Sequence, residues 1–487
     1  DYTVKDGTEQ ANTEYDRNAF SGGYGYQRAG HEFGLNYSNT DLGNTGTPAL
    51  PMDIAYVKGG LWDMHHDWDL GDGVSLKTDV FYQKMRHLMS NCTLRGTCSG
   101  SMYMTNRTQV EAGGISMALA MPFNNGELIV GVDGDQSNHD ANSTMGNAGK
   151  MNENFFNKVE RDRYSLFTEW TGAVSEDVSV ELGARYTHVW SDAGEVSTGA
   201  MSGQVTNRAD RDVFNAQERT KNFNMVDLVA ELQFKANSEV DVNVGVARKN
   251  RAPTYQELYI WTDSKANAGF ADGKTYMGDL GLEVETAYQA DFSLDWHTGN
   301  AYVTPAVFYH YVENYIMGKA GYQVNASGAT PDLIWDNTDA QFFGAELEAG
   351  YRFTDNLRTD ASVNYVRGMQ INAVNGDDDL YRIAPLNGRL QLTYEQSNWS
   401  TSMEGVFVAD QGDVAGYNDE QSTKGYMQLN LRGQYEPCKG LTVATGIENV
   451  LDEQRFNHLG GYQNHSTSND RNYLPGRNLY ATLGYTW

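Results

Sequence analysis

Two methionines and a histidine occupy alternate positions in one short stretch of the sequence. Met85, His87 and Met89 stand two residues apart in QKMRHLMSN. Side chains of a β-strand alternate between its two faces, so these three would share a face if the stretch is a strand. Thioether and imidazole groups together form a ligand set that suits copper, above all the soft monovalent ion. The spacing therefore predicts a candidate metal site made by His87, Met89 and Met85.

Two further groups of candidate residues follow directly in the chain. Met102 and Met104 repeat the two-residue spacing in SMYMTN and could supply a second pair of thioethers. Cys92 and Cys98 lie in a polar, glycine-containing loop, where a disulfide bond would indicate an oxidising compartment. Two free thiols or a metal-binding pair are the alternatives for these cysteines, and Cys438 has no evident partner.

A structural role is the alternative for the methionines and the histidine. Methionine commonly fills gaps in a protein, and a lone histidine in polar surroundings usually forms only hydrogen bonds.

The elements that would position these residues are β-strands. In VSVELGARYT (178–187), apolar residues alternate with polar residues and glycine. Roughly nineteen such segments of about ten or more residues recur, with no convincing helical stretch between them. Tight turns such as LGDG after Leu70 alternate with long polar loops such as 196–221 and 253–285. This alternation is typical of an up-and-down outer-membrane barrel, so we predict an all-β chain forming one large antiparallel transmembrane β-barrel over residues 1–487.

Composition excludes several other classes of protein. The formal net charge is −28 and the mean hydropathy is −0.58, and no basic block is present, so a nucleic-acid partner is not expected. No apolar run approaches the roughly 18–20 residues of a membrane helix, although barrel strands give a weak hydropathy signal. The sequence also contains no nucleophile elbow and no phosphate-binding glycine loop, so we expect no enzymatic activity.

Several segments together resemble the TonB-dependent outer-membrane receptors. They occur in the family's order, as NRAPTYQELYIW (250–261), NTDAQFFGAELEAGYRF (337–353), GLTVATGIENVLDEQRF (440–456) and LPGRNLYATLGYTW (474–487). The resemblance implies a barrel of the 22-stranded type, closed by an internal plug, in the outer membrane of a Gram-negative bacterium. It also implies a TonB-type inner-membrane complex that energises transport through the plug.

The resemblance extends to the candidate metal site. HLMSNCTLR is similar to a barrel segment of the outer-membrane copper receptors within this family. In those receptors an imidazole and a thioether two residues apart meet a cysteine and a methionine contributed by the plug. The resemblance therefore implies His87 and Met89 as ligands, whereas Met85 is added from the alternation alone.

The chain also departs from the family pattern. No segment resembles the plug, and DYTVKDG at the start is interpreted as the end of a barrel strand. About 19–20 strands are expected against 22 in the family. We therefore expect this chain to be the barrel portion of a receptor, with the plug and the first strands outside it.

The function implied by the resemblance is high-affinity uptake of a scarce nutrient, with a metal ion such as copper as the favoured ligand. No resident cofactor is required, and a copper ion is what the candidate site could hold. The alternatives are a ferric-siderophore receptor and a passive porin-like channel. The expected partners are the TonB-type complex, the transported ligand and outer-membrane lipid.

Overall fold

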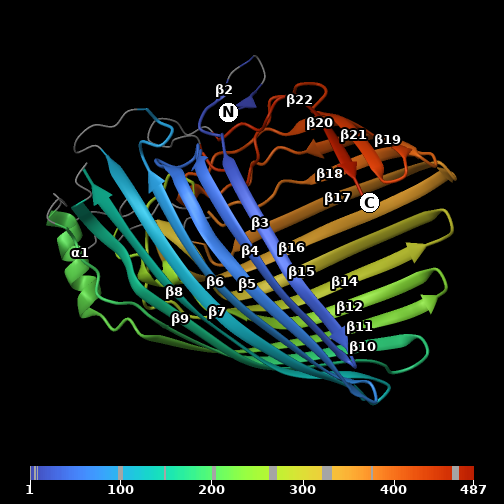
Figure 1. Ribbon diagram of the computed structural model, residues 1–487, viewed down its shortest axis with the longest axis horizontal. Coiled ribbons are helices and arrows are strands. Elements are labelled where there is room, and N and C mark those ends of the chain that lie inside the picture. Colours follow the sequence, from blue (N-terminus) through green and yellow to red (C-terminus); the bar gives the residue numbers. More distant parts are fainter. Residues whose placement is uncertain are drawn as a thin grey trace.

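The computed structural model describes residues 2–4, 7, 9–96, 103–146, 150–199, 205–262, 271–320, 332–373, 377–462 and 471–486. Most of the described chain forms long antiparallel strands that stand side by side as a curved wall (Figure 1). The first half of this wall consists of β3 (Asp16–Arg28), β4 (His31–Thr45), β5 (Asp53–Gly71), β6 (Val74–Ser90), β7 (Met104–Phe123), β8 (Gly126–Met145), β9 (Lys150–Ala173), β10 (Val178–Asp192), β11 (Lys221–Asn237) and β12 (Val240–Arg251). The second half consists of β13 (Tyr276–Met277), β14 (Glu285–His297), β15 (Ala301–Ala320), β16 (Leu333–Thr354), β17 (Leu357–Gln370), β18 (Asn387–Glu395), β19 (Trp399–Val408), β20 (Tyr426–Cys438), β21 (Leu441–Glu448) and β22 (Asn478–Tyr485).

The strands follow one another around a barrel in sequence order. Each pairs antiparallel with the next, apart from the two-residue strand β13, which pairs parallel with β16 and leaves β12 to pair with β14. The barrel order contains 20 strands in the described part of the chain. The predicted all-β, up-and-down barrel is therefore confirmed, and the strand count agrees with the expected number.

Two local expectations are wrong. The first described residues do not end a barrel strand, because β1 (Tyr2–Thr3) and β2 (Glu9–Gln10) form a separate two-stranded sheet. Helices do occur between the strands, namely α1 (Val205–Ala216), α2 (Tyr255–Tyr259) and the 3₁₀ helix η5 (Gly416–Asn418). None of the helices in the described ranges is long and apolar enough to cross a membrane.

The helix α2 shows how the chain leaves the wall at NRAPTYQELYIW. β12 ends at Arg251, and Pro253 cannot donate a ladder hydrogen bond, which favours the end of a strand. Thr254 then caps α2 in a capping box, in which its hydroxyl accepts from the Glu257 amide and the Glu257 carboxylate accepts from the Thr254 amide. The Arg251 guanidinium donates to Glu257, 2.9 Å away, and to Glu285, so the loop start is tied back to the barrel.

The two faces of the wall differ in polarity. A recess of about 520 Å³ is lined by residues of strands from β6 to β12, including Asp79, Arg185 and Asp227. Side chains from strands this far apart can converge only on the concave side of a curved sheet, so these residues mark the lumen. The opposite face exposes large apolar side chains such as Leu182 and Leu228. A polar lumen and an apolar outer surface are what a barrel in a membrane requires.

Candidate metal-binding site

Met85, His87 and Met89 lie on β6 near the end that leads into the long loop after Ser90. Each lies an even number of residues after Asp79 on the same strand and therefore shares its face, and Asp79 faces the lumen. Neighbouring members of the set are about 7 Å apart along the strand. The predicted sharing of one face therefore holds, and we call these three residues the Met–His face.

Residues of the neighbouring strands β5 and β7 flank the Met–His face. Gly59 on β5 pairs with Met85, and a Cβ placed on Gly59 would lie 2.3 Å from the Met85 sulfur. The missing side chain of Gly59 thus makes room for the thioether. His87 stands between Val57 on β5 and Thr108 on β7. Its Nε2 atom is buried and has no hydrogen-bond partner within the described ranges.

Strands β7 and β8 place two further methionines beside this face. Met89 pairs with Asn106, and Met104 lies two residues before Asn106 on the same side of the sheet. Met104 in turn pairs directly with Met145 on β8. Diagonal and direct cross-strand neighbours of this kind are within reach of long side chains. The structure thus brings the predicted Met104 near the Met–His face, whereas Met102 lies outside the described residues.

A second histidine on the same inner face escaped the sequence analysis. His139 on β8 pairs with Val110, which pairs with Met85 on the other side. Its ring stacks on Tyr255 of α2 with 4.3 Å between ring centroids. Spacing along the sequence could not have indicated His139 or Met145, because their proximity depends on the register of β7 and β8.

The loop after β6 is fastened by a buried ion pair. The Arg95 guanidinium donates twice to the Asp53 carboxylate, with both nitrogen–oxygen distances at 2.9 Å, and once to the Thr47 carbonyl oxygen. The Asp53 side chain is fully buried. Cys92 in this loop is disulfide-bonded, while Cys438 is free and exposed. Cys98 lies outside the described residues, so the pairing of Cys92 with Cys98 stays a prediction.

The chemistry available at the Met–His face is that of soft ligands. Within the described ranges, no group of three or more His, Cys, Asp or Glu side chains is arranged to hold a metal ion. A site here would therefore depend on thioethers and imidazole, which select copper rather than the oxygen-binding cations.

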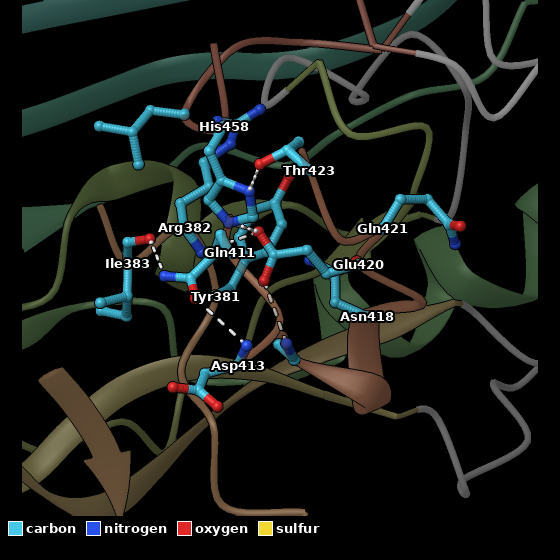
Figure 2. A network of polar contacts seen from close by, with 12 residues as sticks. Tyr381, Arg382, Ile383, Gln411, Asp413, Asn418, Glu420, Gln421, Thr423 and His458 are labelled. Carbon is cyan, nitrogen blue, oxygen red and sulfur yellow. Dashed lines mark hydrogen bonds and ion pairs between the residues drawn. The ribbon is translucent and has the colours of Figure 1, made fainter. Parts of the chain in front are cut away.

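A different polar cluster lies in the long loops at the same end of the barrel as the loop after β6. Figure 2 shows this network from close by. The buried Glu420 carboxylate accepts from the backbone amides of Ala415 and Arg382, at 3.0 and 3.2 Å. The side chains of His458 and Arg471 approach the same carboxylate to 3.2 and 3.3 Å. We call Glu420 and these four partners the rim network; it joins the loops before β18, before β20 and before β22.

Hydrogen bonding outweighs burial in the rim network. Burial alone would raise the pKa of Glu420, but the interaction with His458 and the hydrogen bonds from the backbone amides lower that pKa below its ordinary value. The other nitrogen of His458, Nδ1, lies 3.0 Å from the Thr423 hydroxyl. Nearby, burial raises the pKa of the Tyr417 phenol. The Glu420 carboxylate is thus fully satisfied, whereas the His458 Nε2 atom faces it as an ion-pair partner at 3.2 Å without a hydrogen bond.

The sequence model of the family described as TonB dependent receptor-like, beta-barrel, matches residues 3–450. The chain belongs to this family. The receptor thus comes from a class of outer-membrane proteins that act with TonB, and membership agrees with the barrel, the polar lumen and the long loops. No curated protein matches its sequence closely enough to count as a relative.

Solved structures with the same fold include transporters of different ligands. A structure titled copper transporter OprC has a TM-score of 0.83 at 19% identity and covers 100% of this receptor and 74% of its own chain. The ferric enterobactin receptor PfeA has a TM-score of 0.69 at 14% identity, with coverages of 99% and 73%. The pyoverdine receptor FpvA from Pseudomonas aeruginosa PAO1 has a TM-score of 0.70 at 10% identity, with coverages of 97% and 72%. At these identities the similarity establishes the fold alone.

Proposed function

We propose that this receptor imports copper and that the Met–His face captures the monovalent ion on the inner wall of the barrel. His87 Nε2 and the Met89 sulfur are the proposed ligands, with the Met85 sulfur beside them. Met104 and Met145 extend the line of thioethers toward the outer mouth. In this proposal a plug outside residues 1–487 supplies the remaining ligands and the contact with the TonB-type complex.

The buried, unpartnered Nε2 atom of His87 is the observation that carries the proposal. A buried nitrogen without a hydrogen bond costs free energy, so its retention calls for a compensating role. A thioether stands two residues away on either side, on the same lumenal face. Soft sulfur ligands next to an imidazole favour Cu(I) over Ca²⁺ or Mg²⁺. The fold shared with a structure titled as a copper transporter adds support.

Elemental analysis of the purified receptor tests the proposal. The receptor and its His87→Ala, Met89→Ala variant would be equilibrated with Cu(I) under reducing conditions, washed and measured for copper. We expect the variant to retain at least tenfold less copper, since a soft metal site seldom survives the loss of two ligands.

A matched control comes from the strand next to β6. The variant Met64→Ala, His65→Ala also removes one methionine and one histidine, but from the part of β5 near the short-turn end. Its copper content should equal that of the unaltered receptor. Equal copper in all three proteins would overturn the copper proposal and leave the barrel unaffected.

Ferric-siderophore uptake is the second candidate, because several solved structures with this fold are siderophore receptors. The two candidates differ in the starvation to which the cell should respond. Receptor levels should rise in copper-depleted medium under the copper proposal and in iron-depleted medium under the siderophore alternative. The passive-channel alternative is disfavoured by membership of a TonB-dependent family.

A further inference from the structure

The outward surface of β4, β5 and β6 carries a row of aromatic residues near the middle of the strands. Tyr82 is the ninth residue of β6 counted from the short turn, and about 9–11 residues of a strand suffice to cross a membrane. Tyr37, Trp62 and Tyr82 are direct cross-strand neighbours, and the rings of Tyr37 and Trp62 have centroids 4.5 Å apart. Trp62 and Tyr82 are exposed on the face opposite the Met–His face. Aromatic rows on the lipid-facing side of a barrel mark the boundary between hydrocarbon and headgroups.

Four basic residues follow just beyond this aromatic row. Lys84 and Arg86 lie two and four residues after Tyr82 on β6, so they share its outward face. Lys58 on β5 is directly opposite Arg86, so two like charges face each other across neighbouring strands. Arg107 on β7 is a diagonal neighbour of Arg86, because Arg86 pairs with the residue two positions after Arg107.

Two of these cations are neutralised and two are not. Lys58 pairs with Asp41 at 2.9 Å, and Lys84 pairs with Glu111 at 2.8 Å. Within the described ranges, Arg86 and Arg107 form no ion pair, and both are exposed.

One more acidic residue, Asp140, lies near these basic residues on the outward face and does not neutralise them. Asp140 lies on β8, one strand beyond Gln109, and accepts a hydrogen bond from the Lys158 amide. It forms no ion pair with Arg86 or Arg107 in the described part of the chain.

Like charges placed directly opposite each other destabilise a sheet unless a counter-charge is supplied. The receptor as a whole is strongly acidic, with a formal net charge of −28, so these four basic residues differ in sign from its overall charge. The cluster also lies at the headgroup level, as the adjoining aromatic row indicates. We propose that Arg86 and Arg107, flanked by Lys58 and Lys84, bind the phosphate groups of a lipid of the outer leaflet.

Geometry supports phosphate as the recognised group. Diagonal neighbours on adjacent strands have Cα atoms about 7–8 Å apart, so two arginine side chains can converge on one phosphate or hold two adjacent ones. Guanidinium groups bind phosphate oxygens through paired, charge-assisted hydrogen bonds. A phosphorylated glycolipid would place acyl chains against the apolar wall below and its phosphates against the arginines.

Lipid binding by the delipidated receptor in detergent tests this proposal. The probes are bisphosphorylated lipid A and the same lipid A stripped of both phosphates, with the bound lipid counted by native mass spectrometry. We expect the dissociation constant for the phosphorylated form to be at least tenfold lower. Equal binding of both forms by the unaltered receptor would overturn the proposal without recourse to any variant.

Variants then locate the site. Arg86→Gln, Arg107→Gln should weaken binding of phosphorylated lipid A about tenfold, while Arg86→Lys, Arg107→Lys should retain a large part of it, because charge persists and paired hydrogen bonding does not. Lys77→Gln, Lys249→Gln removes the same charge from the lumenal face and should bind like the unaltered receptor. Undiminished binding by the glutamine variant, or an equal loss in the lumenal control, would contradict the assignment. Copper retention should be unchanged in every variant, which separates this test from that of the proposed function.

Discussion

The Met–His face and the rim network are both polar sites toward the outer side of one barrel, and they are built in opposite ways. In the rim network the Glu420 carboxylate has four partners drawn from three loops, and its side chain is fully buried. On the Met–His face the His87 Nε2 atom is also buried, but no partner lies within the described ranges. A buried polar group that is fully hydrogen-bonded rigidifies a structure, whereas an unpaired one costs free energy. The rim network therefore fastens the loops, whereas the Met–His face retains a buried nitrogen without a hydrogen bond.

Substitution of Glu420 should give the largest effect, because it breaks the network at its centre. The change Glu420→Gln removes the charge that faces the buried His458 and Arg471, and breaking a buried ion pair of this kind costs about 3–5 kcal/mol. We expect faster hydrogen exchange in residues 409–423 and 449–462, measured by mass spectrometry.

The adjacent residue provides the control for this change. Asp419→Asn alters an exposed ion pair with Lys274, which should be worth less than about 1 kcal/mol. Exchange rates that rise equally in both variants would show that the rim network does not fasten the loops.

Acid should open the same loops in the unaltered receptor, with a smaller effect. Because folding lowers the pKa of Glu420, its ionised form stabilises the folded loops above its unfolded pKa of about 4.3. This stabilisation is lost as the pH falls through the lower, folded pKa. Loop exchange, corrected for the intrinsic effect of pH, should therefore increase below about pH 4. The Glu420→Gln variant should lack this acid response, and its persistence there would assign the response to another group.

The substitution Gly59→Ala tests whether the Met–His face needs the space that Gly59 leaves beside Met85. The added Cβ would lie 2.2 Å from the Lys84 carbonyl oxygen and 2.3 Å from the Met85 sulfur, so the strands or the thioether must shift. Overpacking of this kind costs about 1–3 kcal/mol. A lower thermal midpoint together with reduced copper retention is expected. Gly405→Ala, where the added Cβ has an open site with its nearest neighbour 4.0 Å away, should change neither measurement.

The double substitution Met104→Leu, Met145→Leu should have the smallest effect. Leucine conserves volume and removes the sulfur, so the barrel should be nearly unchanged in stability. We expect a loss of a few-fold in Cu(I) affinity, roughly below 1 kcal/mol, measured by competition with a chelator. The reference is Met117→Leu, Met121→Leu, which alters two methionines nearer the short-turn end of β7. If both double variants bind Cu(I) alike, the line of thioethers does not extend to β7 and β8.

Much of the architecture could be predicted from the sequence. The two-residue alternation predicted the strands, and the alternation of tight and long connections predicted an up-and-down barrel. The lumenal position of Met85 followed from parity, since residues two apart must share a face. The helix α1 was missed although Val205, Ala209 and Val213 follow a helical spacing, because so short an apolar stripe in a long polar loop was outweighed by the strand pattern on either side. The strand β1 was misinterpreted because two residues carry too little pattern to distinguish a loop hairpin from a barrel strand.

The sequence by itself determined which residues of β6 share a face, because the pleat of a strand has a fixed period. Only the tertiary structure decided that His139 and Met145 lie beside them, since the register between strands is set by the whole sheet and its loops. The rim network likewise depends on Arg382, Glu420 and His458, which lie in three different loops. Local periodicity carries no information about such contacts, because they form only once the barrel brings the loops together.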